Sequence, residues 1–324
     1  MKKINKILAA NRSEIAIRIF RAAEESGMRT AAVYSKEDRF ALHRFKTDES
    51  YLIGGNKGPI QSYLDIESII KIAKDANVDA IHPGYGFLSE SPEFAEECIK
   101  NDIIFIGPTP QILNKLGNKT EAIKVAKEAS IKTIPSVLIK DQKNEELEKV
   151  VSKIGYPVMV KASWGGGGRG MRVINSANDL FEQIKIAQSE SKKAFGKDDV
   201  FIEKFLEDVA HIEVQILGDQ HNNIIHLYER DCSLQRRHQK IIERAPAHFL
   251  NTDIRNRICK AAISIGKKVN YVGAGTVEFL YDENNNFYFL EMNTRLQVEH
   301  PVSEMISGLD LVQEQIKVAR GEKL

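Results

Sequence analysis

The first 114 residues alternate short apolar runs with segments whose apolar residues recur at helical spacing. In residues 14–26, Ile15, Ile19 and Ala22 recur every three or four positions, with Ser13 placed to cap the helix and Gly27 to end it. The same pattern predicts strands at 6–10, 30–34, 78–82 and 103–106, and helices at 14–26, 65–76 and 92–100. This β-α-β order indicates a parallel, doubly wound sheet, whose ligands usually lie beyond the carboxyl ends of the strands.

The sequence HPGYGFLSE, residues 82–90, follows the third predicted strand. It lies where such sheets bind ligands, and its composition fits either a substrate loop or a rigid structural turn. No GxGxxG motif follows the first strand. A dinucleotide-binding Rossmann domain is therefore disfavoured.

A second, larger domain is predicted over residues 115–324, with a helical connector at 117–132 and a lid over about 133–205. Within the lid, a strand at 157–162 runs into SWGGGGRG, and a second strand follows at 171–174. A Rossmann turn would lead into a helix and a P-loop would need GK[ST], so neither fits. A glycine loop between strands is typical of a flap whose backbone N–H groups cover phosphates; a flexible hairpin tip is the alternative.

The second half of the chain carries strictly alternating strands. In HIEVQIL, residues 211–217, apolar positions alternate with His211, Glu213 and Gln215, which share one face. A strand at 223–229 leads to RDCSLQRRHQK, residues 230–240. We interpret this cluster as a site for phosphate or a small carboxylate. A solvated charge run is the alternative, and a nucleic-acid patch is disfavoured because interleaved aromatic residues are missing.

Two predicted strands, 276–281 and 287–293, flank the turn sequence DENNN. A loop formed by Asn284 and Asn285 places Glu278 opposite Glu291. Opposed like charges are destabilising, so the pair suggests a bound cation such as Mg²⁺; an exposed, salt-bridged strand face is the alternative. If the chain stays extended beyond residue 293, one face carries Glu291, Asn293, Arg295, Gln297 and Glu299. Further helices are predicted at 253–269 and 308–320.

Composition adds limits rather than a function. Hydrophobic residues make up 42% and charged residues 28%, with 46 basic and 45 acidic side chains and a net charge of +1. Such a balance draws the chain neither to nucleic acid nor to a membrane. No run approaches the roughly 18 apolar residues of a membrane span. Three widely spaced cysteines form no CxxC pair, which favours a reducing, cytoplasmic compartment.

A glycine flap, several cations and two opposed glutamates are what nucleotide-triphosphate chemistry requires, with Glu299 as a spare carboxylate for a general base. The strings AANRSEIAIR, HPGYGFLSE, KASWGGGGRGMRV, HIEVQILGD, ERDCSLQRRHQK, GAGTVEF and EMNTRLQVEH resemble the biotin carboxylase family. The resemblance runs from about residue 4 to 322. It implies an α/β fold, in which a Rossmann-like pre-ATP-grasp domain precedes an α+β ATP-grasp domain with a glycine-rich lid.

The resemblance also implies roles for individual residues. The bicarbonate base would be Glu299, and Arg295 would stabilise the enolate-like biotin. The expected ATP contacts are Lys119, Lys161, Gly167, Gly168, His211 and His238, with Glu203, Lys204 and Leu206 at the adenine hinge. The expected Mg²⁺ (or Mn²⁺) ligands are Glu278, Glu291 and Asn293, and the expected bicarbonate contacts are Lys240, Arg295, Gln297 and Val298. Bicarbonate would attack the γ-phosphate to give carboxyphosphate and ADP, and CO₂ released from carboxyphosphate would carboxylate biotin on a separate carrier.

The strings NRSEIAIR, ALHRFKTDES and KASWGGGGRG resemble most the biotin carboxylase region of pyruvate carboxylases, whereas EMNTRLQVEHPVSEM is closer to acetyl-CoA and acyl-CoA carboxylase subunits. Between the two, the resemblance favours pyruvate carboxylase. The resemblance implies a biotin carboxyl carrier and a carboxyltransferase as partners, and a homodimer. Family members continue into a C-terminal subdomain that supplies another biotin-site arginine, but this chain stops at Leu324. We therefore expect a complete ATP half of the site. Two alternatives stay open: a catalytically incomplete Mg-ATP-binding fragment, and another ATP-grasp carboxylate-amine ligase.

Overall fold

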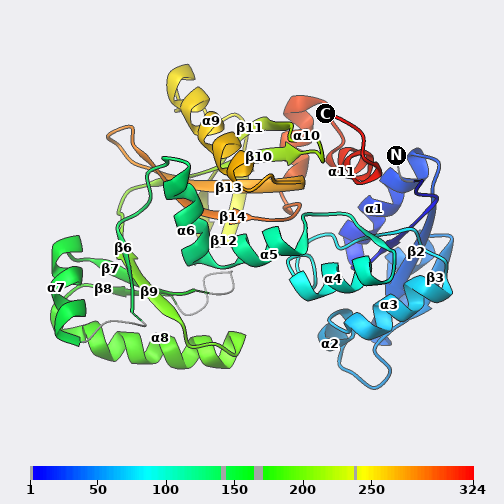
Figure 1. Cartoon of the computed structure of the whole chain (residues 1–324), viewed down its shortest axis with the longest axis horizontal. Helices are drawn as coiled ribbons and strands as arrows, with labels where there is room; N and C mark the ends of the chain where they lie inside the picture. Colours follow the sequence, from blue (N-terminus) through cyan, green and yellow to red (C-terminus); the bar gives the residue numbers. More distant parts are fainter. Residues whose placement is uncertain (1–2, 140–143, 164–170, 237–238) are drawn as a thin grey trace.

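The fold was analysed in a computed structural model that describes residues 3–139, 144–163, 171–236 and 239–324. Figure 1 shows three sheets along the molecule: a parallel sheet near the N-terminus, a central antiparallel sheet, and a smaller sheet that projects to the lower left. Among the described residues, no helix is both long and apolar enough to cross a membrane.

The N-terminal sheet has five strands in the order β3-β2-β1-β4-β5, and all its pairings are parallel. This arrangement confirms the predicted doubly wound sheet, although the edge strand β3 was not predicted. The strands are β1 (Lys6–Ala9), β2 (Arg29–Tyr34), β3 (Glu49–Leu52), β4 (Ala80–His82) and β5 (Ile104–Phe105).

Both faces of this sheet are buried. Along β1 and the residue after it, Ile7 and Ala9 pack toward helices α1 and α11, whereas Leu8 and Ala10 pack toward α3 and α4, as the two-residue period of a strand requires. The helices here are α1 (Ser13–Glu25), α2 (Pro59–Tyr63), α3 (Ile66–Asp75), α4 (Pro92–Lys100), α5 (Pro110–Gly117) and α11 (Leu311–Arg320). Because α11 comes from the far end of the chain, the two termini lie close together (Figure 1).

The central sheet has the order β12-β11-β10-β13-β14, with antiparallel pairings throughout. One face packs its Ile, Val and Phe side chains against α6 and α9, and the polar residues between them form the other face. The elements are α6 (Lys119–Glu128), β10 (Ala210–Gly218), β11 (Ile224–Arg236), β12 (Gln239–Arg244), α9 (Thr252–Lys268), β13 (Gly273–Tyr281), β14 (Phe287–Asn293) and α10 (His300–Ser307). The alternation predicted at 211–217 is therefore what separates the core from the polar face.

The third sheet lies within the range expected for the lid and has the order β6-β9-β7-β8. Its apolar face packs on two helices through Val158, Val160 and Ile202, so Lys161 and Glu203 point to the opposite face. Its elements are β6 (Ser136–Leu138), α7 (Asn144–Ile154), β7 (Val158–Ala162), β8 (Arg172–Ile174), α8 (Leu180–Phe195) and β9 (Val200–Lys204). Residues 164–170, the predicted glycine flap, lie outside the described residues.

Three local predictions were wrong. Ser13 is the first residue of α1 and not its cap; Arg12 holds the cap position, and its guanidinium lies 5.5 Å from the Tyr63 ring centre. The hairpin loop is not the pair Asn284-Asn285, because Asp282 N donates to Asn286 O at 2.9 Å and leaves three residues in the loop. Finally, β14 ends at Asn293, so residues 294–299 do not continue as an extended strand.

Glu278 nevertheless lies opposite Glu291. The longer loop shifts the register by one residue near the turn, where Phe279 pairs with Phe289. A bulge between that pair and the glutamate pair restores the predicted alignment. On the far face, the Phe279 and Phe289 rings pack edge to face with centres 6.5 Å apart, which confirms the predicted aromatic backing.

Candidate active site

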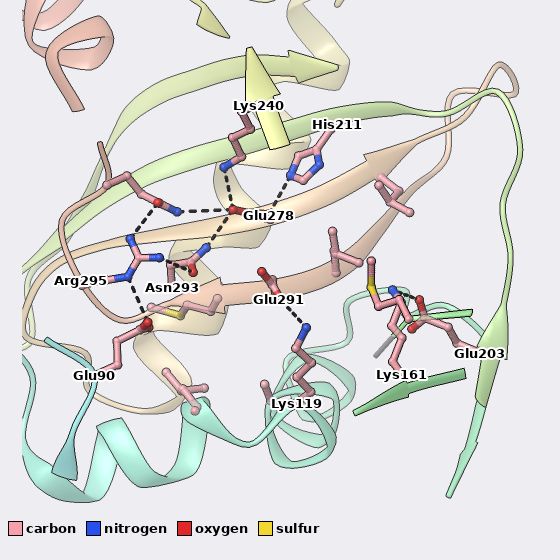
Figure 2. A pocket seen from close by; sticks show the side chains of 18 of the residues that line it. Glu90, Lys119, Lys161, Glu203, His211, Lys240, Glu278, Glu291, Asn293 and Arg295 are labelled. Atoms are coloured by element: carbon pink, nitrogen blue, oxygen red, sulfur yellow. Dashed lines mark hydrogen bonds and ion pairs between the residues drawn. The ribbon is translucent and has the colours of Figure 1, made fainter. Parts of the chain in front are cut away.

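A cavity of about 1350 Å³ lies between the central sheet, the lid sheet, α6 and the start of α4. Gly167, Gly168 and His238 lie outside the described residues. All other expected site residues line this one cavity: Lys119, Lys161, Glu203, Lys204, Leu206, His211, Lys240, Glu278, Glu291, Asn293, Arg295, Gln297, Val298 and Glu299. Figure 2 shows that Lys119 comes from α6, Lys161 and Glu203 from the lid sheet, and His211, Lys240, Glu278, Glu291 and Asn293 from the central sheet. Their roles stay predictions.

Glu278 is the centre of the polar face. Its Oε1 accepts hydrogen bonds from Lys240 at 2.9 Å and from Asn293 Nδ2 at 2.8 Å, and its Oε2 lies 2.7 Å from His211 Nε2. Burial by itself would raise the pKa of Glu278, but the His211 and Lys240 charges outweigh it and hold that pKa far below the ordinary value. Burial likewise disfavours the His211 imidazolium, yet Glu278 raises the pKa of His211.

Glu291, the other member of the opposed pair, is neutralised separately. Lys119 Nζ lies 2.8 Å from Glu291 Oε2. Lys119 is the first residue of α6, and the helix start is fixed because Asn118 Oδ1 accepts hydrogen bonds from Thr120 N and Glu121 N. Burial would lower the pKa of Lys119, but Glu291 outweighs this effect and raises it. The sequence argument was therefore incomplete, because the protein's own cations already relieve the carboxylate repulsion.

Lys240 connects three carboxylates. Its Nζ lies 2.5 Å from Glu213 Oε2, 2.9 Å from Glu278 Oε1 and 2.8 Å from Glu299 Oε1. Burial opposes the charge on Lys240, but these three carboxylates raise its pKa far above the ordinary value, so the ammonium stays protonated. One lysine thus connects the expected metal ligand Glu278 with the expected base Glu299.

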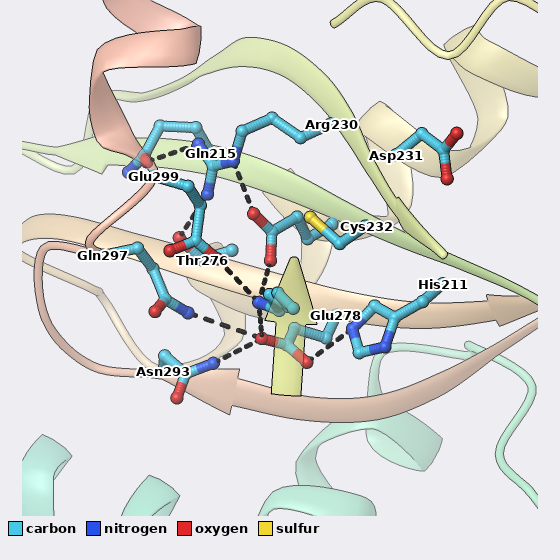
Figure 3. Close-up of polar contacts among 12 residues, drawn as sticks. His211, Gln215, Arg230, Asp231, Cys232, Thr276, Glu278, Asn293, Gln297 and Glu299 are labelled. Carbon is cyan, nitrogen blue, oxygen red and sulfur yellow. Dashed lines mark hydrogen bonds and ion pairs between the residues drawn. The ribbon is translucent and has the colours of Figure 1, made fainter. Parts of the chain in front are cut away.

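Arg230 supports this network from beneath the cavity. Its fully buried guanidinium donates to Glu213 at 2.5 Å, to Gln215 at 3.0 Å and to Ser303 Oγ at 2.7 Å (Figure 3). The two ends of the predicted anion cluster at 230–240 therefore have different roles. Arg230 forms a buried ion pair with Glu213, and Lys240 faces the cavity.

Arg295 lies at the other end of the polar face. Its guanidinium donates to the Leu296 carbonyl at 3.2 Å, to Gln297 Oε1 at 2.9 Å and to Asn293 Oδ1 at 3.4 Å. Gln297 Nε2 in turn approaches Glu278 Oε1 at 3.4 Å. Although the extended strand was wrong, the irregular segment still directs Arg295, Gln297 and Glu299 into the same cavity as β14.

The lid contributes a buried ion pair between Lys161 of β7 and Glu203 of β9. Lys204 lines the cavity, but its ammonium donates to the carbonyls of Gly155 and Tyr156 at 3.1 and 3.0 Å. Apolar side chains, Met159, Leu280 and Met292, also line the cavity. The cavity therefore combines apolar wall with charged groups, which suits a nucleotide.

The donor set at the centre of the cavity fits a hard divalent cation. Glu278, Glu291 and Asn293 offer carboxylate and amide oxygens, the ligands that Mg²⁺ prefers. Asn293 turns its nitrogen toward Glu278 and its oxygen toward Arg295. Its amide would have to rotate by a half turn to present oxygen to an ion beside Glu278.

Sequence reasoning missed three residues of this network. Glu213 was assigned to the polar face and Arg230 to the basic cluster, but the buried pair between them was not foreseen. Glu90, which ends the HPGYGFLSE segment, contacts Arg295 across 205 residues of chain. No local pattern carries these pairings, because each joins two separate elements.

Known proteins match this chain along its whole length. A family model described as "Carbamoyl-phosphate synthase L chain, ATP binding domain" matches residues 118–324, and one described as "Biotin carboxylase, N-terminal domain" matches residues 3–113. The solved biotin carboxylase–beta-gamma-ATP complex from Campylobacter jejuni is 47% identical with a TM-score of 0.96, over 99% of this chain and 72% of that one.

The chain belongs to the biotin carboxylase family.

This is a family of ATP-dependent ligases, and the expected order of a parallel-sheet domain followed by an ATP-grasp domain is confirmed. The Pyruvate carboxylase of Bacillus subtilis (strain 168) is 54% identical over 323 residues, which are 100% of this chain and 28% of that protein. The biotin carboxylase domain dimer of Hydrogenobacter thermophilus 2-oxoglutarate carboxylase, solved with MgADP and bicarbonate, is 45% identical with a TM-score of 0.96. The match covers 100% of this chain and 71% of the Hydrogenobacter chain. The chain thus spans about a quarter of the pyruvate carboxylase, and the domain boundary at residue 114 stays a prediction.

Proposed function

We propose that this chain performs the biotin carboxylase half-reaction of a pyruvate or acyl-CoA carboxylase, in which ATP and bicarbonate carboxylate biotin. The observation that carries the proposal is the position of Lys240, which contacts both Glu278 and Glu299. A nucleotide phosphate held near Glu278 and a bicarbonate held near Glu299 would lie next to each other. That adjacency is what phosphoryl transfer to bicarbonate needs.

ATP would occupy the end of the cavity beside the lid. Glu203, Lys204 and Leu206 would surround the adenine, while Lys119 and Lys161 would neutralise phosphate charge as point cations. In the structure these lysines are paired with Glu291 and Glu203. We infer that nucleotide binding exchanges these partners, with phosphate oxygens taking the place of the carboxylates.

Mg²⁺ (or Mn²⁺) would be held by Glu278, Glu291 and Asn293. When bound, such an ion neutralises the β- and γ-phosphate oxygens and orients them. His211 keeps the Glu278 carboxylate oriented from one side and Lys240 from the other.

Bicarbonate would bind between Lys240, Arg295, Gln297 and Val298, with Glu299 as the base. The carboxylate of Glu299 would remove the bicarbonate proton, and the bicarbonate oxygen would then attack the γ-phosphate to give carboxyphosphate and ADP. Lys240 and Arg295 offset the negative charge that gathers on the anion. For the carboxylation of biotin that follows, we assign Arg295 to the biotin ureido oxygen, where enolate-like charge develops.

The proposed biotin carboxylase reaction implies partner proteins. A biotin carboxyl carrier would bring biotin, and a carboxyltransferase would consume the product; the final acceptor is pyruvate or an acyl-CoA. A homodimer is supported by the Hydrogenobacter relative, whose biotin carboxylase domain was solved as a dimer. We also propose a reducing compartment such as the cytoplasm, because Cys98, Cys232 and Cys259 are buried free thiols.

ADP release by the 324-residue chain, measured with and without bicarbonate and free biotin, tests the function. We expect ADP formation to depend on bicarbonate and to rise with biotin. Mg-ATP binding without bicarbonate-dependent ADP formation would instead establish a catalytically incomplete fragment. Ligation of an amine without bicarbonate would indicate a different carboxylate-amine ligase.

A further inference from the structure

Glu90 reaches from the N-terminal domain to the proposed bicarbonate end of the cavity. Its Oε2 accepts a hydrogen bond from Arg295 Nε at 3.0 Å (Figure 2). Its Oε1 accepts two more, from Thr294 N at 3.1 Å and from Thr294 Oγ1 at 3.2 Å. The two carboxylate oxygens of Glu90 therefore accept hydrogen bonds from two consecutive residues of the other domain, Thr294 and Arg295.

Thr294 is a buried residue that anchors Glu90 to the central sheet. The residue is only 1% exposed, and it follows Asn293, where β14 ends. The main chain leaves the sheet at this point, so Thr294 N cannot continue the strand pairing. Glu90 satisfies this amide and thereby fixes the direction in which the chain leaves the strand.

Glu90 itself is held by a rigid loop. Asn11 Nδ2 donates to the carbonyls of Pro83 and Tyr85, at 2.8 Å each, and the Phe87 ring stacks on Tyr63 with centres 4.9 Å apart. One residue beyond Glu90, Ser91 Oγ caps α4 by accepting from Phe94 N at 3.1 Å. The HPGYGFLSE segment thus has the properties of a structural turn, and its last residue contacts the site.

Arg295 carries five N–H donors. Four are used within the described residues, by Glu90, Leu296, Gln297 and Asn293. Among these partners only Glu90 is charged, and a hydrogen bond between charged groups is generally stronger than a neutral one. The fifth donor, the second N–H of Nη2, has no partner among the described residues and can then be presented in a fixed direction.

We propose that Glu90 is a positioning residue, which fixes the Arg295 guanidinium and so connects the N-terminal domain to the bicarbonate end of the site. This inference rests on the function proposed above for its catalytic consequence. Glu90 acts through Arg295 and does not contact the reacting atoms.

The placement is tested first without catalysis, by NMR of the arginine Nε–H groups in the full 324-residue chain. The Arg295 signal is assigned by its disappearance in Arg295→Lys. We expect slowed exchange of this proton with solvent in the wild type and fast exchange in Glu90→Ala. The matched control is Glu97→Gln on α4, whose carboxylate is paired with Lys100 on the surface, and it should leave the signal unchanged. An unchanged Arg295 signal in Glu90→Ala would overturn the proposal.

The catalytic consequence is tested by bicarbonate-dependent ADP formation. Misplacing a catalytic group by about 1 Å can cost about 10²-fold, so we expect Glu90→Ala to lower kcat/KM for bicarbonate by about 10- to 100-fold. The KM for ATP should stay within about twofold, since Glu90 contacts no group assigned to the nucleotide. Glu90→Gln keeps one acceptor oxygen and should lie between wild type and Glu90→Ala; it also replaces Glu90→Ala if that variant fails to fold.

A double-mutant cycle separates positioning from a general structural effect. If Glu90 acts through Arg295, Glu90→Ala should change turnover by less than about twofold in an Arg295→Ala background. If Glu90→Ala lowered turnover equally in the wild-type and Arg295→Ala backgrounds, the positioning role of Glu90 would be overturned, but the proposed function would not. A wild-type chain without bicarbonate-dependent turnover would overturn the proposed function, and the NMR signal would still decide whether Glu90 fixes Arg295.

Discussion

Lys240 Nζ lies 2.8 Å from Glu299 Oε1 and 2.9 Å from Glu278 Oε1, so one ammonium group bridges the two ends of the candidate site. The three residues come from β12, the segment before α10, and β13. Exchanging any one of them changes the charge balance of the other two. The following predictions use this coupling and the buried pairs around it.

Replacing the base should separate nucleotide binding from chemistry. General-base groups contribute about 10²- to 10⁴-fold, so Glu299→Gln should lower bicarbonate-dependent ADP formation by at least about 10²-fold. Mg-ATP affinity, measured by calorimetry, should change by less than about threefold. Glu121→Gln, on the exposed side of α6, is the charge-matched control. Unchanged turnover in Glu299→Gln would remove Glu299 from the role of base.

Removing the buried arginine should destabilise the fold. Arg230→Met leaves the fully buried Glu213 with Lys240 as its remaining cation partner among the described residues. Breaking a buried ion pair costs about 3–5 kcal/mol, so we expect a loss of that size in the free energy of urea unfolding. The surface variant Arg21→Met should change it by less than about 0.5 kcal/mol. A loss below about 1 kcal/mol for Arg230→Met would contradict the assigned role.

A divalent ion alone should bind weakly. Lys119, Lys240 and His211 already neutralise Glu291 and Glu278, so an ion without phosphates must displace protein cations. We expect Mg²⁺ alone to leave the melting temperature nearly unchanged and Mg-ATP to raise it, since a ligand at 100 times its Kd adds about 2.7 kcal/mol. Glu291→Gln should weaken Mg-ATP binding by about tenfold. An equal rise with Mg²⁺ alone would show a preformed metal site.

His82, at the end of β4, should make stability depend on pH. Its Nδ1 accepts from Gly84 N at 3.0 Å, its Nε2 contacts Gln315 Oε1 at 3.2 Å, and burial lowers the pKa of His82 to about 4 from an ordinary value of 6.5. Between these values only the unfolded chain binds the proton, so the stability contributed by neutral His82 is present above about pH 6.5 and is lost as pH falls toward 4.

We therefore expect the difference in unfolding free energy between wild type and His82→Gln to shrink by about 2 kcal/mol from pH 7 to pH 5. Denaturant titrations at each pH measure this difference. A difference that stays constant over that interval would mean that His82 takes up its proton equally well in the folded chain.

Much of the architecture could be predicted from periodicity. The apolar run Ile7–Ala10 predicted a strand, because a strand buried on both faces of its sheet has few polar positions. The apolar spacing in residues 14–26 predicted a helix. The alternation at His211, Glu213 and Gln215 likewise predicted the polar face of the central sheet. Short or exposed elements such as β3 and β12 were missed, because edge strands need no regular apolar pattern.

The hairpin shows how a correct contact can follow from an incorrect turn. Asn285 does take a positive φ of 59°, but within a three-residue loop. The bulge that cancels the resulting register shift lies between the Glu278–Glu291 pair and the Phe279–Phe289 pair, a position that local propensity does not encode.

The sequence by itself determined which residue types are available and, for the strands it predicted, which face each residue occupies, since that face follows from the two-residue repeat of the backbone. Only the tertiary structure decided the partners. Lys119 neutralises Glu291, Arg230 is consumed by Glu213, and Glu90 holds Arg295. These contacts join residues far apart in the chain, and their distances are set by how the central sheet, the lid sheet and the helices around them pack about one cavity.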